Sequence, residues 1–278
     1  MTPRELIRQA AARFEQAGVP DPLIDASLLL AHVTGQQALF LRADSWSQVP
    51  QETQDAFDAL CQRRLTREPL QYLLGEQPFL GRSFHVDDRV LIPRPETELL
   101  AEKAIAALKK AGDSPCALDM CCGSGCLAIS MALEVPGAQV HACDLSEGAL
   151  AVTRGNAQAL GAAITLHQGD LFDALPPQRF DVIVSNPPYI PSADCLTLQQ
   201  EVLQEPAMAL DGGTDGYDFY RRIAQAAPHW LKPGGTLLLE VGYDQARHVA
   251  ALLKEAGLRD VAIHEDYQHI ERMVEAHL

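Results

Sequence analysis

The tetrapeptide Asn186-Pro187-Pro188-Tyr189 consists of residue types that can capture a planar amino group. It directly follows the run Phe180–Ser185, which has the apolar pattern of a buried strand. Asparagine offers a side-chain oxygen as acceptor, and the prolines lack backbone N–H groups, so hydrogen bonds to the Pro-Pro backbone end on carbonyl oxygens. Tyr189 adds a flat apolar face with a polar tip. We therefore predict that these four residues orient an –NH2 group, the alternative being an ordinary proline-rich exit from a strand.

Three acidic residues, Asp119, Asp144 and Asp170, end or follow strand patterns earlier in the chain. Ligands of open α/β sheets bind beyond the carboxyl ends of the strands, so the three carboxylates are expected near one site. The first acid leads into the glycine-rich turn at residues 121–125, where the backbone can approach a ligand closely. The second acid can accept both ribose hydroxyls, and the third can accept from an adenine amino group. Asp144 or Asp170 alone could instead be a helix N-cap or a turn residue.

Together the three acids describe an adenosine that carries a positive charge and no phosphate. The turn lacks the third glycine of the dinucleotide fingerprint, since Ala128 stands there, and it has no Walker lysine. The sequence has no Cys-x-x-Cys or His-x-x-x-His pair, so we predict no metal site. The residues expected to contact the cofactor are Asp119, Cys121, Gly123, Ser124, Gly125, Asp144, Asp170, Leu171 and Asn186.

The elements that position these residues follow from hydrophobic periodicity after residue 115. Short apolar runs alternate there with helical spacing, which predicts a mostly parallel sheet with helices on both faces. The last two runs have no helix between them and predict an antiparallel terminal hairpin. Expected strands are 117–120, 140–144, 164–166, 182–184, 236–241, 261–264 and 272–276, and expected helices are 126–134, 147–160, 218–230 and 245–256.

The N-terminal part of the chain reads differently, because helical patterns there are not interrupted by strands. Thr2-Pro3-Arg4-Glu5 is a capping box with proline at the first helical position. We expect a helical bundle domain at residues 1–75, a β-hairpin linker at 76–95 and a Rossmann-like domain at 96–278. The helical domain could dock substrate or simply add stability.

Composition restricts the partners. The 278 residues include 22 Lys and Arg against 37 Asp and Glu, a formal net charge of −15. Strong nucleic-acid binders need cationic surface, so we expect no stable nucleic-acid partner and favour a protein or small-molecule substrate. No run is long enough for a membrane span, and no signal pattern begins the chain. An odd number of cysteines, seven, favours a reducing cytoplasm over a disulfide framework.

The sequence resembles the class I S-adenosylmethionine-dependent methyltransferases in the 119–125 loop and in Asp144 and Asp170. Its Asn-Pro-Pro-Tyr motif is similar to that of the amino-methylating branch. The segment Pro93–Glu98, the segment Glu205–Gly216 and the N-terminal helices narrow the resemblance, over essentially the whole chain, to the HemK/PrmC family of peptide chain release factor glutamine N5-methyltransferases. Cys121-Cys122, where Gly-Thr is more usual, is a departure.

The resemblance implies methyl transfer from S-adenosylmethionine to the side-chain N5 of the glutamine in the GGQ motif of class 1 peptide chain release factors, leaving S-adenosylhomocysteine. We also expect a cytoplasmic monomer with no membrane partner. Catalytic roles would fall to Asn186, Pro187 and Tyr189: the Asn186 Oδ1 and the Pro187 carbonyl would accept the two amide N–H groups, and Tyr189 would pack on the amide. These three and Pro188 would contact substrate.

Three other readings remain open. One is a glutamine methyltransferase of a ribosomal protein, although that sibling typically has a serine where this chain has Pro95. The second is a nucleic-acid exocyclic amino methyltransferase. The third is a cofactor-binding scaffold without activity. Arg94 and Glu96 could organise the hairpin near the methionine end of the cofactor, or Pro95-Glu96 could simply begin a helix.

Overall fold

The computed structural model describes the backbone of residues 1–278 and all side chains except that of residue 174. The chain forms two compact units. Unit 1 comprises residues 1–76 together with the distant stretch 199–204, and unit 2 comprises residues 77–198 and 205–278. None of the described helices is both long and apolar enough to cross a membrane.

Unit 1 is built from short helices around one apolar core. The capping box predicted for its first helix is present, since the Thr2 N–H donates to Glu5 and the Glu5 N–H donates to the Thr2 hydroxyl. The core includes the fully buried Phe14, Leu29 and Phe57. The helices are α1 (Pro3–Gln16), α2 (Pro22–Thr34), α3 (Ala38–Ala43), α4 (Gln51–Leu65), α5 (Leu70–Leu74) and the 3₁₀ turn η3 (Val202–Gln204).

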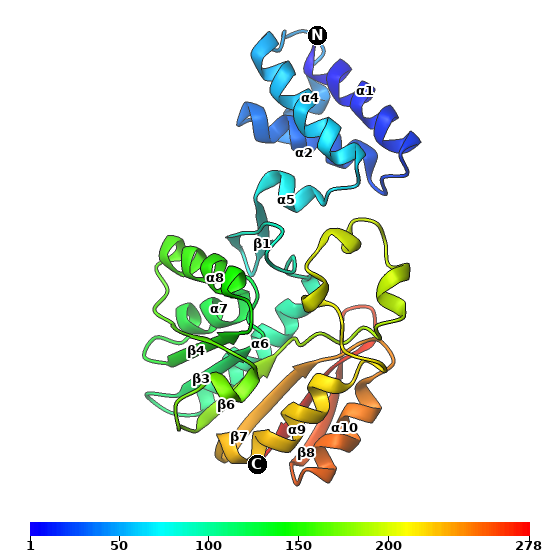
Figure 1. Cartoon of the computed structure of the whole chain (residues 1–278). Coiled ribbons are helices and arrows are strands. Elements are labelled where there is room, and N and C mark those ends of the chain that lie inside the picture. Colours follow the sequence, from blue (N-terminus) through cyan, green and yellow to red (C-terminus); the bar gives the residue numbers. More distant parts are fainter. The chain divides into compact units, whose positions relative to one another are not determined.

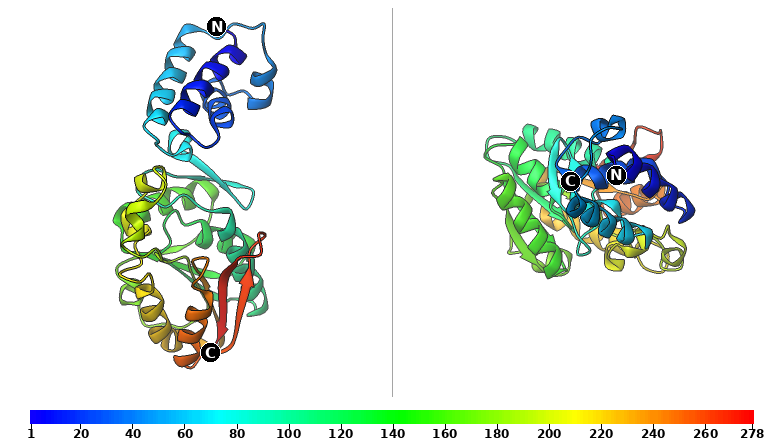
Figure 2. Two further views of the ribbon diagram at one scale, coloured as in Figure 1. Left: turned by 90° about the vertical axis from the view of Figure 1, so that its right-hand side faces the viewer. Right: turned by 90° about the horizontal axis from the view of Figure 1, so that it is seen from above.

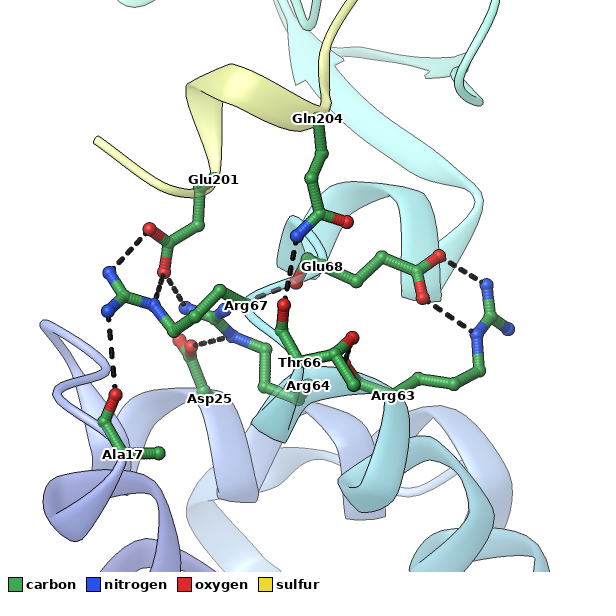
Figure 3. A network of polar contacts seen from close by, with 9 residues as sticks. All are labelled: Ala17, Asp25, Arg63, Arg64, Thr66, Arg67, Glu68, Glu201 and Gln204. Atoms are coloured by element: carbon green, nitrogen blue, oxygen red, sulfur yellow. Dashed lines mark hydrogen bonds and ion pairs between the residues drawn. The ribbon is translucent and has the colours of Figure 1, made fainter. Parts of the chain in front are cut away.

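A buried ion-pair network attaches the stretch 199–204 to unit 1 (Figure 3). The Arg64 guanidinium, whose side chain is 4 % exposed, contacts Asp25 at 2.8 Å and Glu201 at 2.9 Å. Arg67 donates to both oxygens of the same Glu201 carboxylate, from Nε at 2.6 Å and from Nη2 at 2.5 Å. Gln204 donates to the Thr66 carbonyl at 3.0 Å. The sequence predicts one domain at residues 96–278, whereas residues 199–204 of that range belong to unit 1.

Unit 2 contains a seven-stranded sheet in the order β5-β4-β3-β6-β7-β9-β8 (Figure 1). The strands β5, β4, β3, β6 and β7 pair in parallel, and β9 runs antiparallel to both β7 and β8, as predicted. This terminal hairpin is seen in orange and red in Figure 2. The strands are β3 (Cys116–Met120), β4 (Gln139–Asp144), β5 (Thr165–Gln168), β6 (Phe180–Ser185), β7 (Leu231–Glu240), β8 (Arg259–Glu265) and β9 (Glu271–His277).

Helices cover both faces of this sheet, because side chains alternate between the faces along each strand. Leu118 and Met120 of β3 lie in one apolar cluster with residues of α9 and α10, and Ala117 lies in the other with residues of α6 and α7. The helices are α6 (Pro95–Lys110), α7 (Cys126–Glu134), α8 (Glu147–Leu160), α9 (Asp218–Trp230) and α10 (Ala246–Glu255). A two-stranded sheet, β1 (Glu76–Phe79) with β2 (Arg82–His85), precedes them. Three 3₁₀ turns complete unit 2: η1 (Leu171–Ala174), η2 (Asp194–Thr197) and η4 (Ala207–Ala209).

Candidate active site

A cavity of about 650 Å³ lies at the carboxyl ends of β3, β4, β5 and β6. The strand order reverses between β3 and β6, which is where open α/β sheets bind ligands. The volume of the cavity falls within the range of about 300–1,000 Å³ that is usual for ligand and cofactor sites. Of the residues that the sequence predicted for the site, the cavity is lined by Cys121, Gly123, Asp144, Asp170, Leu171, Asn186 and Pro188.

The glycine-rich turn between β3 and α7 packs against Thr153 of α8. Gly125 is the N-cap of α7 with φ of 80°, and a Cβ there would approach Thr153 Cγ2 to 2.6 Å. The Thr153 hydroxyl donates to the Gly123 carbonyl at 2.7 Å. A Cβ on Gly123 would meet no atom within 4 Å, so this glycine leaves space where the cavity lies. The turn therefore needs glycine at residue 125 for packing and at residue 123 for its backbone conformation and open space.

Two non-glycine residues of the cavity wall have left-handed backbone conformations. The φ angle is 60° at Cys121 and 51° at Leu171. Such conformations cost energy for L residues and concentrate at functional sites. Glycine adopts such a φ without strain, which agrees with the Gly-Thr that the family resemblance leads one to expect in place of Cys121-Cys122. Burial raises the pKa of the Cys121 thiol well above the ordinary value, so this thiol stays protonated.

Asp144 lies at the end of β4 and braces the glycine-rich turn. Its Oδ2 accepts from the Gly123 N–H and its Oδ1 from the Ser146 N–H, both at 2.9 Å. Burial raises the pKa of this carboxyl. Asp170 is about half exposed and pairs with Arg222 of α9 at 2.8 Å. A carboxylate beside an open glycine backbone, with a second acid on the neighbouring strand end, fits a ribose and a base and offers no cationic phosphate clamp at the turn.

Asp119, Ser124 and Gly125 lie outside the cavity wall. The Asp119 side chain is fully buried, and its Oδ2 accepts from the Ala128 N–H of α7 at 2.9 Å. Its Oδ1 has no hydrogen-bond partner among the described residues, and burial raises its pKa to about 8. In this structure Asp119 thus anchors the start of α7 rather than facing the cavity.

The Asn-Pro-Pro-Tyr segment leaves β6 at the cavity. Asn186 and Pro188 line the cavity, whereas Pro187 and Tyr189 do not. The Tyr189 carbonyl accepts from the Gln245 side chain at 2.9 Å. A Cβ on Gly212 would approach the Tyr189 Cα to 2.7 Å, so the 210–216 loop can pack on this segment only with glycine there.

Sequence reasoning missed two residues next to Asn186. The Asn186 side-chain NH2 donates to the Thr97 hydroxyl at 3.3 Å, and that hydroxyl donates to Glu240 Oε2 at 2.7 Å. Thr97 lies in the segment Pro93–Glu98 that the sequence singled out, and Glu240 is the last residue of β7. No spacing rule links them, since they are 143 positions apart.

Arg94 and Glu205 form an ion pair next to the cavity wall, where Pro206 follows Glu205. Glu205 is buried, accepts from the Ile92 N–H at 3.0 Å and forms an ion pair with Arg94. This ion pair connects the segment before α6 to Glu205, whose neighbour Pro206 lines the cavity. Arg94 is also the N-cap residue of α6, so the helix-start interpretation is confirmed for this segment.

A nucleoside-type cavity at this switch point, in a sheet with an antiparallel β9, defines a class I S-adenosylmethionine-dependent methyltransferase. Residues 5–75 match the PrmC N-terminal domain, and residues 96–216 match the methyltransferase small domain. The chain belongs to the PrmC/HemK family of release factor glutamine methyltransferases, which confirms the resemblance seen in the sequence.

Three relatives illustrate the match. A release factor glutamine methyltransferase of Bordetella pertussis is 45 % identical over 253 residues, which cover 91 % of this chain and 93 % of the relative. A ribosomal protein uL3 glutamine methyltransferase of the same organism is 42 % identical over 265 residues, 90 % of this chain and 87 % of the relative. The crystal structure of a Pyrococcus furiosus methyltransferase matches with a TM-score of 0.52 at 17 % identity, covering 71 % of this chain and 89 % of that one, and supports the fold.

Proposed function

We propose that this chain transfers a methyl group from S-adenosylmethionine to the side-chain N5 of the glutamine in the GGQ motif of class 1 peptide chain release factors. One observation carries the proposal: Asn186 and Pro188 line the same cavity as Gly123 and Asp144. The residues proposed to orient the amide and the carboxylate proposed to bind the nucleoside therefore line a single cavity.

Different residues of the cavity wall suit different parts of the cofactor. When bound, S-adenosylmethionine supplies a methyl group on a positively charged sulfur. The Asp144 carboxylate suits the ribose hydroxyls, and Asp170 with Leu171 suits the adenine. Cys121 and Gly123 also line the cavity, and a Cβ on Gly123 would meet no atom within 4 Å, so this glycine leaves room for a ligand.

The substrate residues act on a poor nucleophile, since an amide nitrogen shares its lone pair with the carbonyl. The Asn186 Oδ1 and the Pro187 carbonyl would each accept one N–H of the glutamine amide, and Tyr189 would pack on its flat face. The amide nitrogen held in this way would form the new N–C bond as the C–S bond of the cofactor broke, and its proton would leave for solvent. Positioning is the main contribution, so no strong base is required.

A glutamine of ribosomal protein uL3 is the second candidate substrate, because a uL3 enzyme is among the relatives. Pro95 favours the release factor, since the ribosomal-protein sibling typically has serine there. The net charge of −15 disfavours nucleic acid.

The test is to incubate the full chain with S-adenosylmethionine and, separately, a class 1 release factor, uL3 or ribosomal RNA, and to locate the methyl by tandem mass spectrometry. We expect one methyl on the GGQ glutamine. Asn186→Ala should lower kcat by at least about 100-fold while cofactor affinity, measured by calorimetry, changes less than about threefold. Methylation of uL3 or RNA but not of the release factor would overturn the substrate; collapse of cofactor affinity in the variant would overturn the role of Asn186.

The proposal also includes a monomer in a reducing cytoplasm. All seven cysteines are free thiols, including buried Cys122 and Cys143, which supports a reducing compartment. Light scattering on the purified chain tests the monomer.

A further inference from the structure

The amide of Asn186 has two orientations with opposite chemistry. With Oδ1 toward the substrate it accepts an N–H from the glutamine amide; with Nδ2 there it presents donors to donors. Asparagine itself has no preference between these orientations, so the surrounding hydrogen bonds must decide.

The neighbours of Asn186 form a chain of hydrogen bonds with one direction. An ionised Glu240 carboxylate can only accept, so the single Thr97 proton goes to Glu240 Oε2, at 2.7 Å. The Thr97 oxygen is then left as an acceptor. Only the NH2 end of Asn186 can donate to it, at 3.3 Å, and this leaves Oδ1 available.

We propose that Thr97 and Glu240 are positioning residues that hold the Asn186 amide with Oδ1 available to the substrate glutamine. The inference rests on the proposed function, because it concerns how that amide accepts the substrate N–H.

Burial of Thr97 and Glu240 makes their hydrogen bonds favour one orientation of the Asn186 amide. Thr97 and Glu240 are each 3 % exposed, so water does not compete for their hydrogen bonds. Thr97 is held by the first turn of α6, where its N–H donates to the Arg94 carbonyl, and Glu240 is held at the end of β7. Two backbone elements of unit 2 therefore fix the two side chains independently of the substrate.

The direction of the chain depends on the charge of Glu240. Burial raises the pKa of this carboxyl to about 7. Once protonated, Glu240 can donate to Thr97, and the Thr97 hydroxyl can then donate to Asn186 Oδ1, which stabilises the wrong orientation. The ionisable groups that interact with Glu240 come from the segment before α6, α6, α7, the loop after β6, α9 and β9: Arg94, Glu96, Cys126, Tyr189, Tyr220 and Arg272.

The test compares Thr97→Val, which has the same shape without the hydroxyl, with Thr97→Ser, which keeps it. With saturating S-adenosylmethionine and release factor, we expect Thr97→Val to lower kcat by about 5- to 20-fold, from the loss of one orienting hydrogen bond. Thr97→Ser should stay within about threefold of the wild type, and cofactor affinity should be unchanged in both. Thermal denaturation of each variant confirms that it is folded.

The pH profile supplies a reading that a merely structural role would not change. The kcat of the wild type should fall on acidification through the titration of Glu240, and Glu240→Gln should remove that acid limb. Glu96→Gln, which alters the other carboxyl that interacts with Glu240, should retain it. The inference is overturned if Thr97→Val keeps full kcat, if Thr97→Ser fails to rescue, or if Glu240→Gln keeps the limb. Full activity of Asn186→Ala would instead overturn the role of Asn186, and a wild-type chain that does not methylate the release factor would overturn the proposed function.

Discussion

Cys121 illustrates at the scale of a single residue how the cavity wall depends on backbone conformation. Its φ of 60° lies in the left-handed region, which costs an L residue about 1–2 kcal/mol. The conformation turns the chain so that the Gly123 N–H meets Asp144 Oδ2 at 2.9 Å. A side chain without a branch at Cβ tolerates this conformation better than a β-branched one.

We therefore expect opposite effects from two substitutions at Cys121. Cys121→Gly should keep or improve affinity for S-adenosylmethionine, whereas Cys121→Val should weaken it by at least about tenfold, because a β-branched residue disfavours this φ. Calorimetric titration with S-adenosylmethionine measures both, with thermal denaturation as a check of folding. Equal affinities in the two variants would show that the left-handed turn is not needed for binding.

At the scale of elements, the stretch 199–204 is held by buried charges rather than by an apolar face. The Glu201 side chain is 15 % exposed and pairs with both Arg64 and Arg67 (Figure 3). Removing one partner from such a network leaves buried charge uncompensated. The pair between Arg63 and Glu68 is more exposed, at 53 % and 22 %, and contributes less.

Glu201→Ala should accordingly destabilise unit 1 by about 1–3 kcal/mol. Glu68→Ala removes a carboxylate from the neighbouring, more exposed pair and should cost only about 0–1 kcal/mol. Differential scanning calorimetry of the full chain compares the two, and limited proteolysis should show faster cleavage near exposed Leu203 only in Glu201→Ala. Equal stabilities of the two variants would contradict the importance of the network.

At the scale of the whole molecule, buried carboxyls make stability depend on pH. Burial raises the pKa of Asp119 to about 8 and that of Glu240 to about 7, and it raises those of Asp25 and Asp144 as well. The folded chain therefore holds protons that the unfolded chain releases near pH 4, so ionising these groups lowers the free energy of unfolding as pH rises. Hydrogen bonds from Arg89 lower the pKa of Asp87 to about 2, which has the opposite effect in acid.

We expect the melting temperature of the unliganded chain to be highest near pH 5 and to fall towards pH 8. Below the maximum, protonation of carboxyls such as Asp87 removes stability; above it, ionisation of Asp119 and Glu240 does so. Asp119→Asn keeps an acceptor for the Ala128 N–H and should flatten the decline above pH 5. A melting temperature that rises steadily to pH 8 would show that these carboxyls ionise without cost.

The sequence by itself determined the alternation of strands and helices, the acids at the strand ends and the position of the Asn-Pro-Pro-Tyr segment directly after a strand. These follow from local periodicity and turn chemistry, which a few neighbouring residues encode. Only the tertiary structure decided that Asp119 anchors α7, that residues 199–204 join unit 1, and that Thr97 meets Glu240 beside Asn186. The physical reason is that these contacts depend on which helix packs against which strand and on side-chain directions, and no local pattern specifies a hydrogen bond across 143 positions.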